Sequence, residues 1–143
     1  MNAKVTKFNE FLTANNINCF QAQAIENEMH SVLYRSFMEV NGQNLPTMVV
    51  VDDSIYVMVQ VRVAAAVVKE ANRTAIMEHI NKLNDTYKVF KYYVNENGDI
   101  VIESCIPSTD EEFVPGLVHA VIDVIFKHLQ EEYARIMKLV WAN

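Results

Sequence analysis

Residues 55–63 read IYVMVQVRV and carry the clearest structural signal in the chain. β-Branched apolar residues alternate there with larger or polar ones, a period-two pattern that predicts a β-strand with one face in the core. The predicted core face consists of Ile55, Val57, Val59, Val61 and Val63. The opposite face carries Tyr56 and Met58 beside Gln60 and Arg62, and this mixture suits an adaptable contact surface.

The segment before residue 55 predicts one helix followed by further strands. Residues 3–15 have the apolar spacing of a short amphipathic helix. Turn signals follow at Asn41-Gly42 and at residues 52–54, because Gly tolerates positive φ and Asp and Ser favour turns. The predicted strands cover residues 18–25, which are weak, and residues 31–40 and 45–51. Short turns between consecutive strands imply antiparallel pairing.

The segment after residue 63 completes the predicted domain. It contains a helix over 71–84, a strand, turn and strand over 92–107, and a long helix over 114–140. Pro115 fits the first turn of that last helix, where its missing N–H costs nothing. The chain therefore predicts one domain over residues 1–143. Its class is α+β, with a twisted antiparallel sheet flanked by helices on one side, in the order α-β-β-β(-β)-α-β-β-α.

The stretch YYVNENGDIVIESCIP, residues 92–107, also resembles part of a calcium-binding loop. An EF-hand loop needs Gly at its sixth position, a side-chain ligand at its first and a bidentate Glu at its twelfth. With Gly98 at the sixth position, Tyr93 occupies the first and Ser104 the twelfth. Neither residue suits its role, so no calcium site is expected.

The same stretch fits a β-hairpin well. Asn97-Gly98 is a favoured pair for a two-residue type I′ turn, and strand-forming residues flank it. This turn predicts that Val94 pairs with Val101. One predicted face then carries Val89, Lys91, Tyr93, Ile100, Ile102 and Ile106, and the other carries Phe90, Tyr92, Val94, Val101, Glu103 and Cys105.

Both predicted hairpin faces are largely apolar, so the domain's own helices can cover only one of them. The other face needs a second subunit or a partner protein. The sequence therefore predicts a homodimer or a protein-binding surface. Its expected residues are Tyr56, Met58, Phe90, Tyr92, Val94 and Val101.

The overall composition indicates a water-soluble protein. The chain has 143 residues, a hydrophobic fraction of 51% and a net charge of −6, so it can build a core and is repelled by phosphate backbones. No nucleic-acid or membrane partner is expected, because no uncharged run approaches the length of a bilayer span. The N-terminus lacks a signal-peptide core. Cys19 and Cys105 are expected to be ordinary buried thiols in a cytoplasmic protein.

Motifs for catalysis and cofactor binding are missing from the chain. With only Gly42, Gly98 and Gly116, the chain cannot form the usual glycine-rich phosphate or nucleophile motifs. His119 and Asp123 lie four residues apart on the last predicted helix and could share a metal ion, but two ligands are too few for a stable site. We therefore predict no catalytic, cofactor-binding or metal residue, and a protein that is not an enzyme.

Two alternative functions are compatible with the residues. A small-molecule binder or enzyme would use a pocket between the sheet and the last helix. Its candidate polar groups are Tyr34, Arg62, His119 and Asp123, which would have to converge in one cavity. An RNA-binding sheet would use Lys88, Phe90 and Tyr92, although the net charge disfavours it.

The second half of the chain resembles a known family. The segment INKLNDTYKVFKYYVNENGDIVIESCIP, residues 80–107, is similar to the YbjN-type family of bacterial sensory transduction regulators. The matching features are the Asn81 and Asn84 pair near a helix end, an aromatic strand, the turn at residues 97–99, the strand ending at Pro107 and the final helix. The resemblance covers residues 70–140 well, and residues 3–65 only in the order of elements.

The resemblance implies a fold similar to that of type III secretion chaperones, which is often dimeric. Proteins with that fold bind protein segments and carry out no chemistry. The family supplies no catalytic residues to transfer, and Asn81 and Asn84 are interpreted as helix-terminal residues that satisfy backbone groups. The expected function is a non-enzymatic interaction module, a regulator or chaperone-like adaptor that binds another protein through sheet and helix surfaces.

Overall fold

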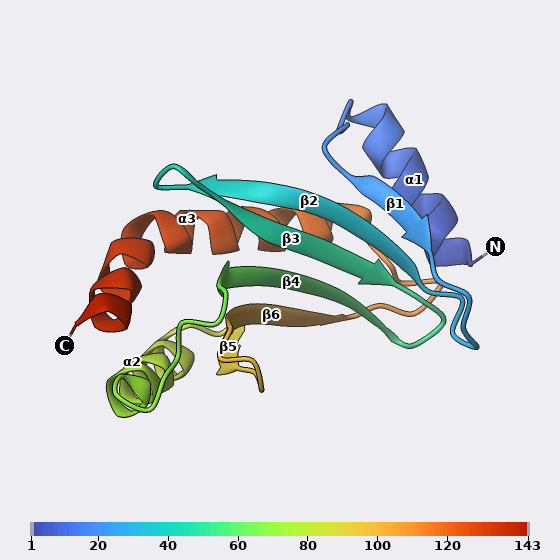
Figure 1. The fold of residues 1–143 in the computed structure, drawn as a ribbon. Coiled ribbons are helices and arrows are strands. Elements are labelled where there is room, and N and C mark those ends of the chain that lie inside the picture. Colours follow the sequence, from blue (N-terminus) through green and yellow to red (C-terminus); the bar gives the residue numbers. More distant parts are fainter. Residues whose placement is uncertain (1, 143) are drawn as a thin grey trace.

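A computed structural model describes residues 2–142, and its order of elements matches the one predicted from the sequence (Figure 1). Within this range the chain forms three helices and a six-stranded antiparallel sheet, so the α+β class is confirmed. The elements are α1 (Ala3–Ala14), β1 (Gln21–Ala24), β2 (Val32–Val40), β3 (Gln43–Val51), β4 (Tyr56–Ala64), α2 (Arg73–Thr86), β5 (Lys91–Val94), β6 (Ile100–Pro107) and α3 (Pro115–Trp141).

The strands lie in the order β1-β2-β3-β4-β6-β5, so β3 and β4 form the centre of the sheet. All pairs are antiparallel. The predicted turn at Asn41-Gly42 joins β2 to β3, with φ of 50° and 78° at its two residues. These positive φ values are those of a type I′ turn, which matches the twist of the flanking strands.

The three helices cover one face of the sheet, and α3 runs along that face behind β2 and β3 in the view of Figure 1. The core lies between α3 and the central strands. On β4 the residues Val57, Val59, Val61 and Val63 are 0–1% exposed, as the alternation predicts. Ile55 is 58% exposed, contrary to the prediction. It precedes β4 in the turn, where its carbonyl accepts a hydrogen bond from the Ser108 N–H at 2.6 Å.

The β5–β6 hairpin differs from its prediction by one residue of register. Its loop has three residues, 96–98, because the Asn95 N–H donates to the Asp99 carbonyl and the Gly98 N–H donates to the Asn95 carbonyl. The Asn95 side-chain oxygen also accepts from the N–H groups of Asn97 and Asp99, both at 3.0 Å. Val101 therefore pairs with Tyr93, whereas the predicted two-residue turn would pair it with Val94.

This shift exchanges the two faces of β5, because successive side chains of a strand point to opposite sides. Tyr92 and Val94 point to the helix-covered face, where Tyr92 is 3% exposed. Lys91 and Tyr93 point to the uncovered face instead. Phe90, just before the strand, is also in the core, at 2% exposed.

Gly98 is held by the chain that leads from β4 to α2. Its carbonyl accepts hydrogen bonds from the N–H groups of Val67 and Val68, both at 3.0 Å. A Cβ atom at residue 98 would lie 2.8 Å from the Val68 carbonyl oxygen, and φ there is +79°. Both the backbone conformation and the close approach therefore require glycine.

Candidate interaction surfaces

The face of the sheet opposite the helices, hereafter the open face, is covered by no helix within residues 2–142. Strand register places its side chains in rows across the sheet. One row runs Leu33, Val50, Met58 and Cys105, a second runs Arg35, Met48, Gln60 and Glu103, and a third contains Phe37, Pro46, Arg62 and Val101. Aromatic, Met and Arg side chains of this kind are enriched at protein interfaces.

A hollow of about 600 Å³ lies on the open face, between β1 and the β5–β6 hairpin. Its lining includes residues from all six strands, among them Arg35, Phe37, Met48, Arg62 and Val101. Phe37 is 69% exposed although it is one of the largest apolar side chains of the sheet. The open face is therefore a broad surface that mixes apolar and charged groups.

A small hydrogen-bond network crosses the open face. The Gln60 Nε2 donates to Glu103 Oε2 at 3.1 Å and to the Tyr93 hydroxyl at 3.2 Å. The Tyr93 hydroxyl donates to the same Glu103 oxygen at 2.9 Å. Partial burial and this contact with Glu103 raise the pKa of Tyr93, so the hydroxyl stays a donor. The network fixes three side chains of three strands in one arrangement.

The two arginines of the open face are less constrained. Arg35 and Arg62 are exposed, and no hydrogen bond or ion pair of either guanidinium is found among the residues that the structure describes. Asp99 also borders the hollow, and its pKa is lowered by hydrogen bonds from Asn95 and the Ala66 N–H and by the charge of Arg62. The open face therefore presents charges of both signs.

The structure separates the six residues predicted for a dimer or partner surface. Tyr56 and Met58 lie on the open face, and Val101 lies on the same side of the sheet but is only 4% exposed. Phe90, Tyr92 and Val94 lie on the helix-covered face, so their assignment to an exposed surface was wrong. The cause is the three-residue loop, which moved each side chain of β5 to the other side. Tyr93 replaces them on the open face. Because Phe90 and Tyr92 are buried, neither can stack on RNA bases.

A buried polar cluster between β5, α2 and α3 was not predicted from the sequence. The Tyr92 hydroxyl lies 2.7 Å from His128 Nε2, and His79 Nε2 lies 2.6 Å from Glu132 Oε2. Burial raises the pKa of Tyr92 and lowers the pKa of His128. Arg135 also bonds Glu132 at 3.2 Å. The partners come from distant parts of the chain, and only the fold brings them together.

This cluster has a structural explanation. Tyr87, Phe90 and Tyr92 surround the His128 ring, with ring centroids 4.4 to 5.7 Å away. No buried side-chain nitrogen or oxygen of the described chain lacks a hydrogen-bond partner, so the polar groups are satisfied where they are. The cluster therefore holds α3 against β5.

The four polar residues expected in a pocket do not converge. Tyr34 is in the core, where its hydroxyl donates to Asn9 Oδ1 at 2.7 Å. Arg62 lies on the open face, across the sheet from α3. His119 and Asp123 border a separate groove beside α3, and Asp123 forms an ion pair with Lys127 at 2.9 Å. This separation is evidence against the predicted small-molecule pocket.

The two cysteines are free and exposed, which corrects the prediction of buried thiols. Partial burial, with smaller effects of Glu103 and Asp52, raises the pKa of Cys105, so its environment does not favour the reactive thiolate. Residues 2–142 contain no group of three or more His, Cys, Asp or Glu side chains placed to hold a metal ion. Nor does that range contain a helix with the length and apolarity needed to cross a membrane.

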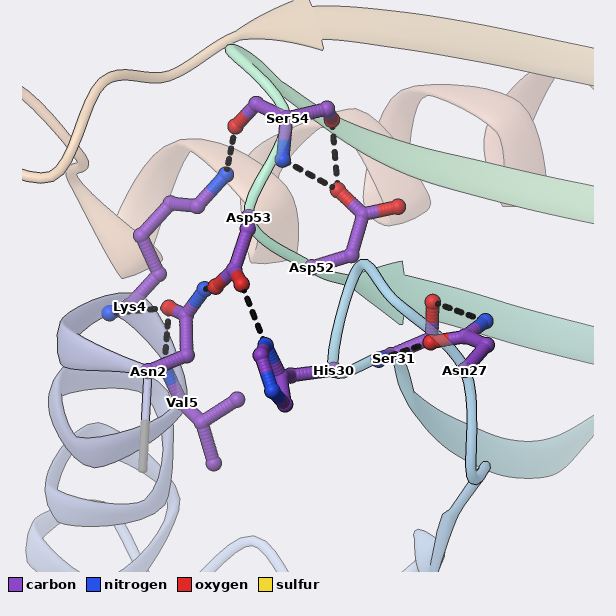
Figure 2. Close-up of polar contacts among 9 residues, drawn as sticks. All are labelled: Asn2, Lys4, Val5, Asn27, His30, Ser31, Asp52, Asp53 and Ser54. Atoms are coloured by element: carbon purple, nitrogen blue, oxygen red, sulfur yellow. Dashed lines mark hydrogen bonds and ion pairs between the residues drawn. The ribbon is translucent and has the colours of Figure 1, made fainter.

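A dense polar corner joins α1 to the β3–β4 turn (Figure 2). The Asn2 side-chain oxygen caps α1 by accepting from the N–H groups of Lys4 and Val5, and its amide donates to Asp53. Lys4 is 0% exposed, and its Nζ donates to the carbonyls of Ser54 at 2.6 Å and Tyr56 at 3.0 Å.

Figure 2 shows Asp53 between Asn2 and His30, whose Nδ1 lies 2.6 Å from the carboxylate. Hydrogen bonds from these two residues lower the pKa of Asp53. The Asp52 carboxylate turns back to accept from the Ser54 N–H and hydroxyl. The predicted turn role of residues 52–54 is therefore confirmed, and the corner anchors the N-terminal helix.

Comparison with protein-family models gives one match. The YbjN family, described as "Putative bacterial sensory transduction regulator", matches residues 11–135. The match extends on the N-terminal side beyond residues 70–140, the part that the sequence resemblance covers well, and includes the first four strands. Comparison with curated proteins gives no match. The chain belongs to the YbjN family.

Proposed function

We propose that this protein is a non-enzymatic interaction module, a regulator or chaperone-like adaptor that works by binding other proteins in the cytoplasm. The observation that supports this most directly is the open face, a whole sheet surface with no helix over it in the described chain. Its exposed Phe37, Tyr56 and Tyr93 would be costly to leave in water. The description of the family as a regulator is consistent with the same function.

The occupant that the open face fits best is a second copy of this chain. A two-fold interface needs a self-complementary surface, in which a group on one copy meets a different group on the other. The open face offers Arg35 and Arg62 together with the carboxylate of Glu103. Arginines of one copy can therefore face carboxylates of the other, while the apolar rows pack between them.

The test is the mass of the protein in solution. Sedimentation velocity at micromolar concentration should give a dimer for the natural sequence and a monomer for the double variant Tyr56→Asp/Met58→Asp, because two buried carboxylates without partners would oppose association. Val124→Asp is the matched control, since Val124 is an exposed apolar residue of α3 on the other layer. A natural protein that is monomeric at all accessible concentrations would contradict the open-face dimer.

A further inference from the structure

The two outer edges of the sheet differ in how their outward-facing backbone groups are covered. At β5 the side chain of Asn84 in α2 covers the edge: its Oδ1 accepts from the Tyr92 N–H at 2.8 Å and its Nδ2 donates to the Tyr92 carbonyl at 3.1 Å. The amide of Asn84 thus takes the place of a neighbouring strand. Such covering is how proteins prevent unwanted pairing at a sheet edge.

The other edge is covered only in part. β1 pairs with β2 from Val32 to Arg35 and leaves the rest of β2, residues 36–40, without a strand on its outer side. The Ile25 N–H donates to the Ser31 carbonyl, so odd-numbered residues of β2 direct their backbone groups outward. Phe37 and Glu39 therefore offer N–H and C=O groups for pairing with a further strand.

An apolar groove of about 300 Å³ lies beside this uncovered edge, between β2 and α3. Its lining includes Phe20, Met38, Ile122 and Phe126. Side chains on one side of an added strand would enter this groove, because alternate residues of a strand point to opposite faces. The groove therefore selects apolar residues at every second position.

The rim of the groove is acidic. Glu39 is exposed, and no ion pair of its carboxylate occurs among residues 2–142, whereas Asp123 is already bonded to Lys127. The side chain of Glu39 belongs to the open-face side of β2, opposite Met38. A basic residue on the outer side of an added strand would meet this charge.

We propose that the edge of β2 from Ser36 to Val40 is a docking site for an extended segment of a partner protein. The segment joins the sheet as a strand, end to end with β1, with apolar side chains toward α3 and a Lys or Arg toward Glu39. Two copies of this chain fit the site less well, because edge-to-edge pairing would bring two Glu39 carboxylates into one short seam. The proposal rests on the proposed function and names where the interaction module takes its partner.

The probe is the synthetic peptide Thr-Val-Lys-Val-Lys-Val-Thr-amide with carboxyfluorescein on its N-terminal amine, measured by fluorescence anisotropy. Two matched controls carry N-methyl groups, one on the valine nitrogens and one on the lysine nitrogens. Since these two sets of N–H groups point to opposite edges of a strand, one control should bind at least about tenfold more weakly and the other about as well as the parent. Equal affinity of the three peptides, or no binding at 1 mM peptide, would overturn the proposal.

Hydrogen exchange read by NMR locates the bound peptide. The amide hydrogens of Phe37 and Glu39 should exchange rapidly in the free protein and at least about tenfold more slowly with the peptide. Ile122→Asp and Glu39→Gln should each weaken binding, while Val124→Asp should not. Protection that rises with protein concentration in the absence of peptide would show a second copy on the edge and would also overturn the proposal.

The same titration with Tyr56→Asp/Met58→Asp keeps the two proposals separate. If this variant binds the peptide as tightly as the natural protein does, the edge site is supported, whatever the oligomeric state of the variant. A dimer that does not bind the peptide would refute the edge site and leave the open-face interface in place.

Discussion

At the scale of single residues, two glycines with similar backbone angles have different surroundings. Gly42 and Gly98 have φ of +78° and +79°. A Cβ atom at residue 42 would meet nothing within 4 Å, whereas one at residue 98 would lie 2.8 Å from the Val68 carbonyl oxygen. Alanine substitutions at the two positions therefore distinguish the cost of backbone strain from the cost of a steric contact.

Gly98→Ala should lower the free energy of unfolding by about 2–4 kcal/mol, and Gly42→Ala by about 1–2 kcal/mol, the cost of a left-handed conformation alone. Urea denaturation followed by circular dichroism measures both variants. Equal losses for the two would show that the hairpin loop can move away from Val68.

A second residue-scale prediction concerns pH. Burial lowers the pKa of His128 below its usual 6.5, although Glu132 and Glu131 act in the opposite direction. Tyr92 faces His128 from β5, and the rings of Tyr87 and Phe90 also pack against it. Because the unfolded chain takes up the proton first, His128 stabilises the fold fully above pH 6.5, and that contribution is lost as the pH falls below 6.5.

The free energy of unfolding should therefore fall less steeply between pH 7 and pH 5 in His128→Gln than in the natural protein. Urea denaturation at several pH values in this window gives the two slopes. His119→Gln, at an exposed position of the same helix, serves as the control and should keep the natural slope. A slope unchanged by His128→Gln would mean that other groups cause the pH dependence.

At the scale of elements, helix α2 caps the β5 edge of the sheet as well as covering part of one face. Asn84 and Asn81 lie on this helix, but only Asn84 reaches the backbone of β5. Asn84→Ala should lower the free energy of unfolding by about 1–3 kcal/mol, because the Tyr92 N–H and carbonyl lose their partners. Asn81→Ala should change it by less than about 0.5 kcal/mol, since Asn81 is exposed.

Urea denaturation and hydrogen exchange at Tyr92 check this prediction. The Tyr92 amide should exchange faster in Asn84→Ala and at the natural rate in Asn81→Ala. Equal effects of the two substitutions would mean that Asn84 acts through the helix and not through the strand edge.

The elements also show what a sequence can predict. Period-two and helical spacing located most helices and strands of the described chain, because each of these segments buries one face. Strand β1 is exposed along its whole length, and its sequence signal was accordingly weak. The hairpin register was wrong because Asn97-Gly98 is a strong local signal for a two-residue turn. The Asn95 side chain and the contact of Gly98 with Val68 select a longer loop instead. The second of these is a long-range contact that local rules do not contain.

The prediction of the candidate surface succeeded where it depended on local alternation and failed where it depended on the hairpin register. Tyr56 and Met58 lie on the open face because the alternation of β4 places them there. Val101 lies on the same side of β6 but is only 4% exposed. Their role in a dimer or partner surface stays a prediction. Phe90 and Tyr92 were assigned to the wrong side, since one residue of register decides the face. The contact between Tyr92 and His128 spans distant segments and had no signal in the sequence.

At the scale of the whole molecule, association through the open face should link stability to concentration. Binding that occurs only in the folded state raises the melting temperature as the protein becomes more concentrated. The natural protein should therefore melt several degrees higher at 100 μM than at 1 μM, while Tyr56→Asp/Met58→Asp should not shift. Differential scanning fluorimetry measures both, and a concentration-independent melting temperature of the natural protein would contradict the dimer.

The amide of Asn84 also limits how far such molecules can assemble. A sheet with two free edges can act as a monomer unit in an open-ended polymer, since each addition creates a new edge for the next. Here the β5 end of each sheet is closed by its own helix, so two copies joined through their β2 edges would leave no free edge from which growth can continue. Copies of this chain alone are therefore not expected to build an open-ended fibre through their sheet edges.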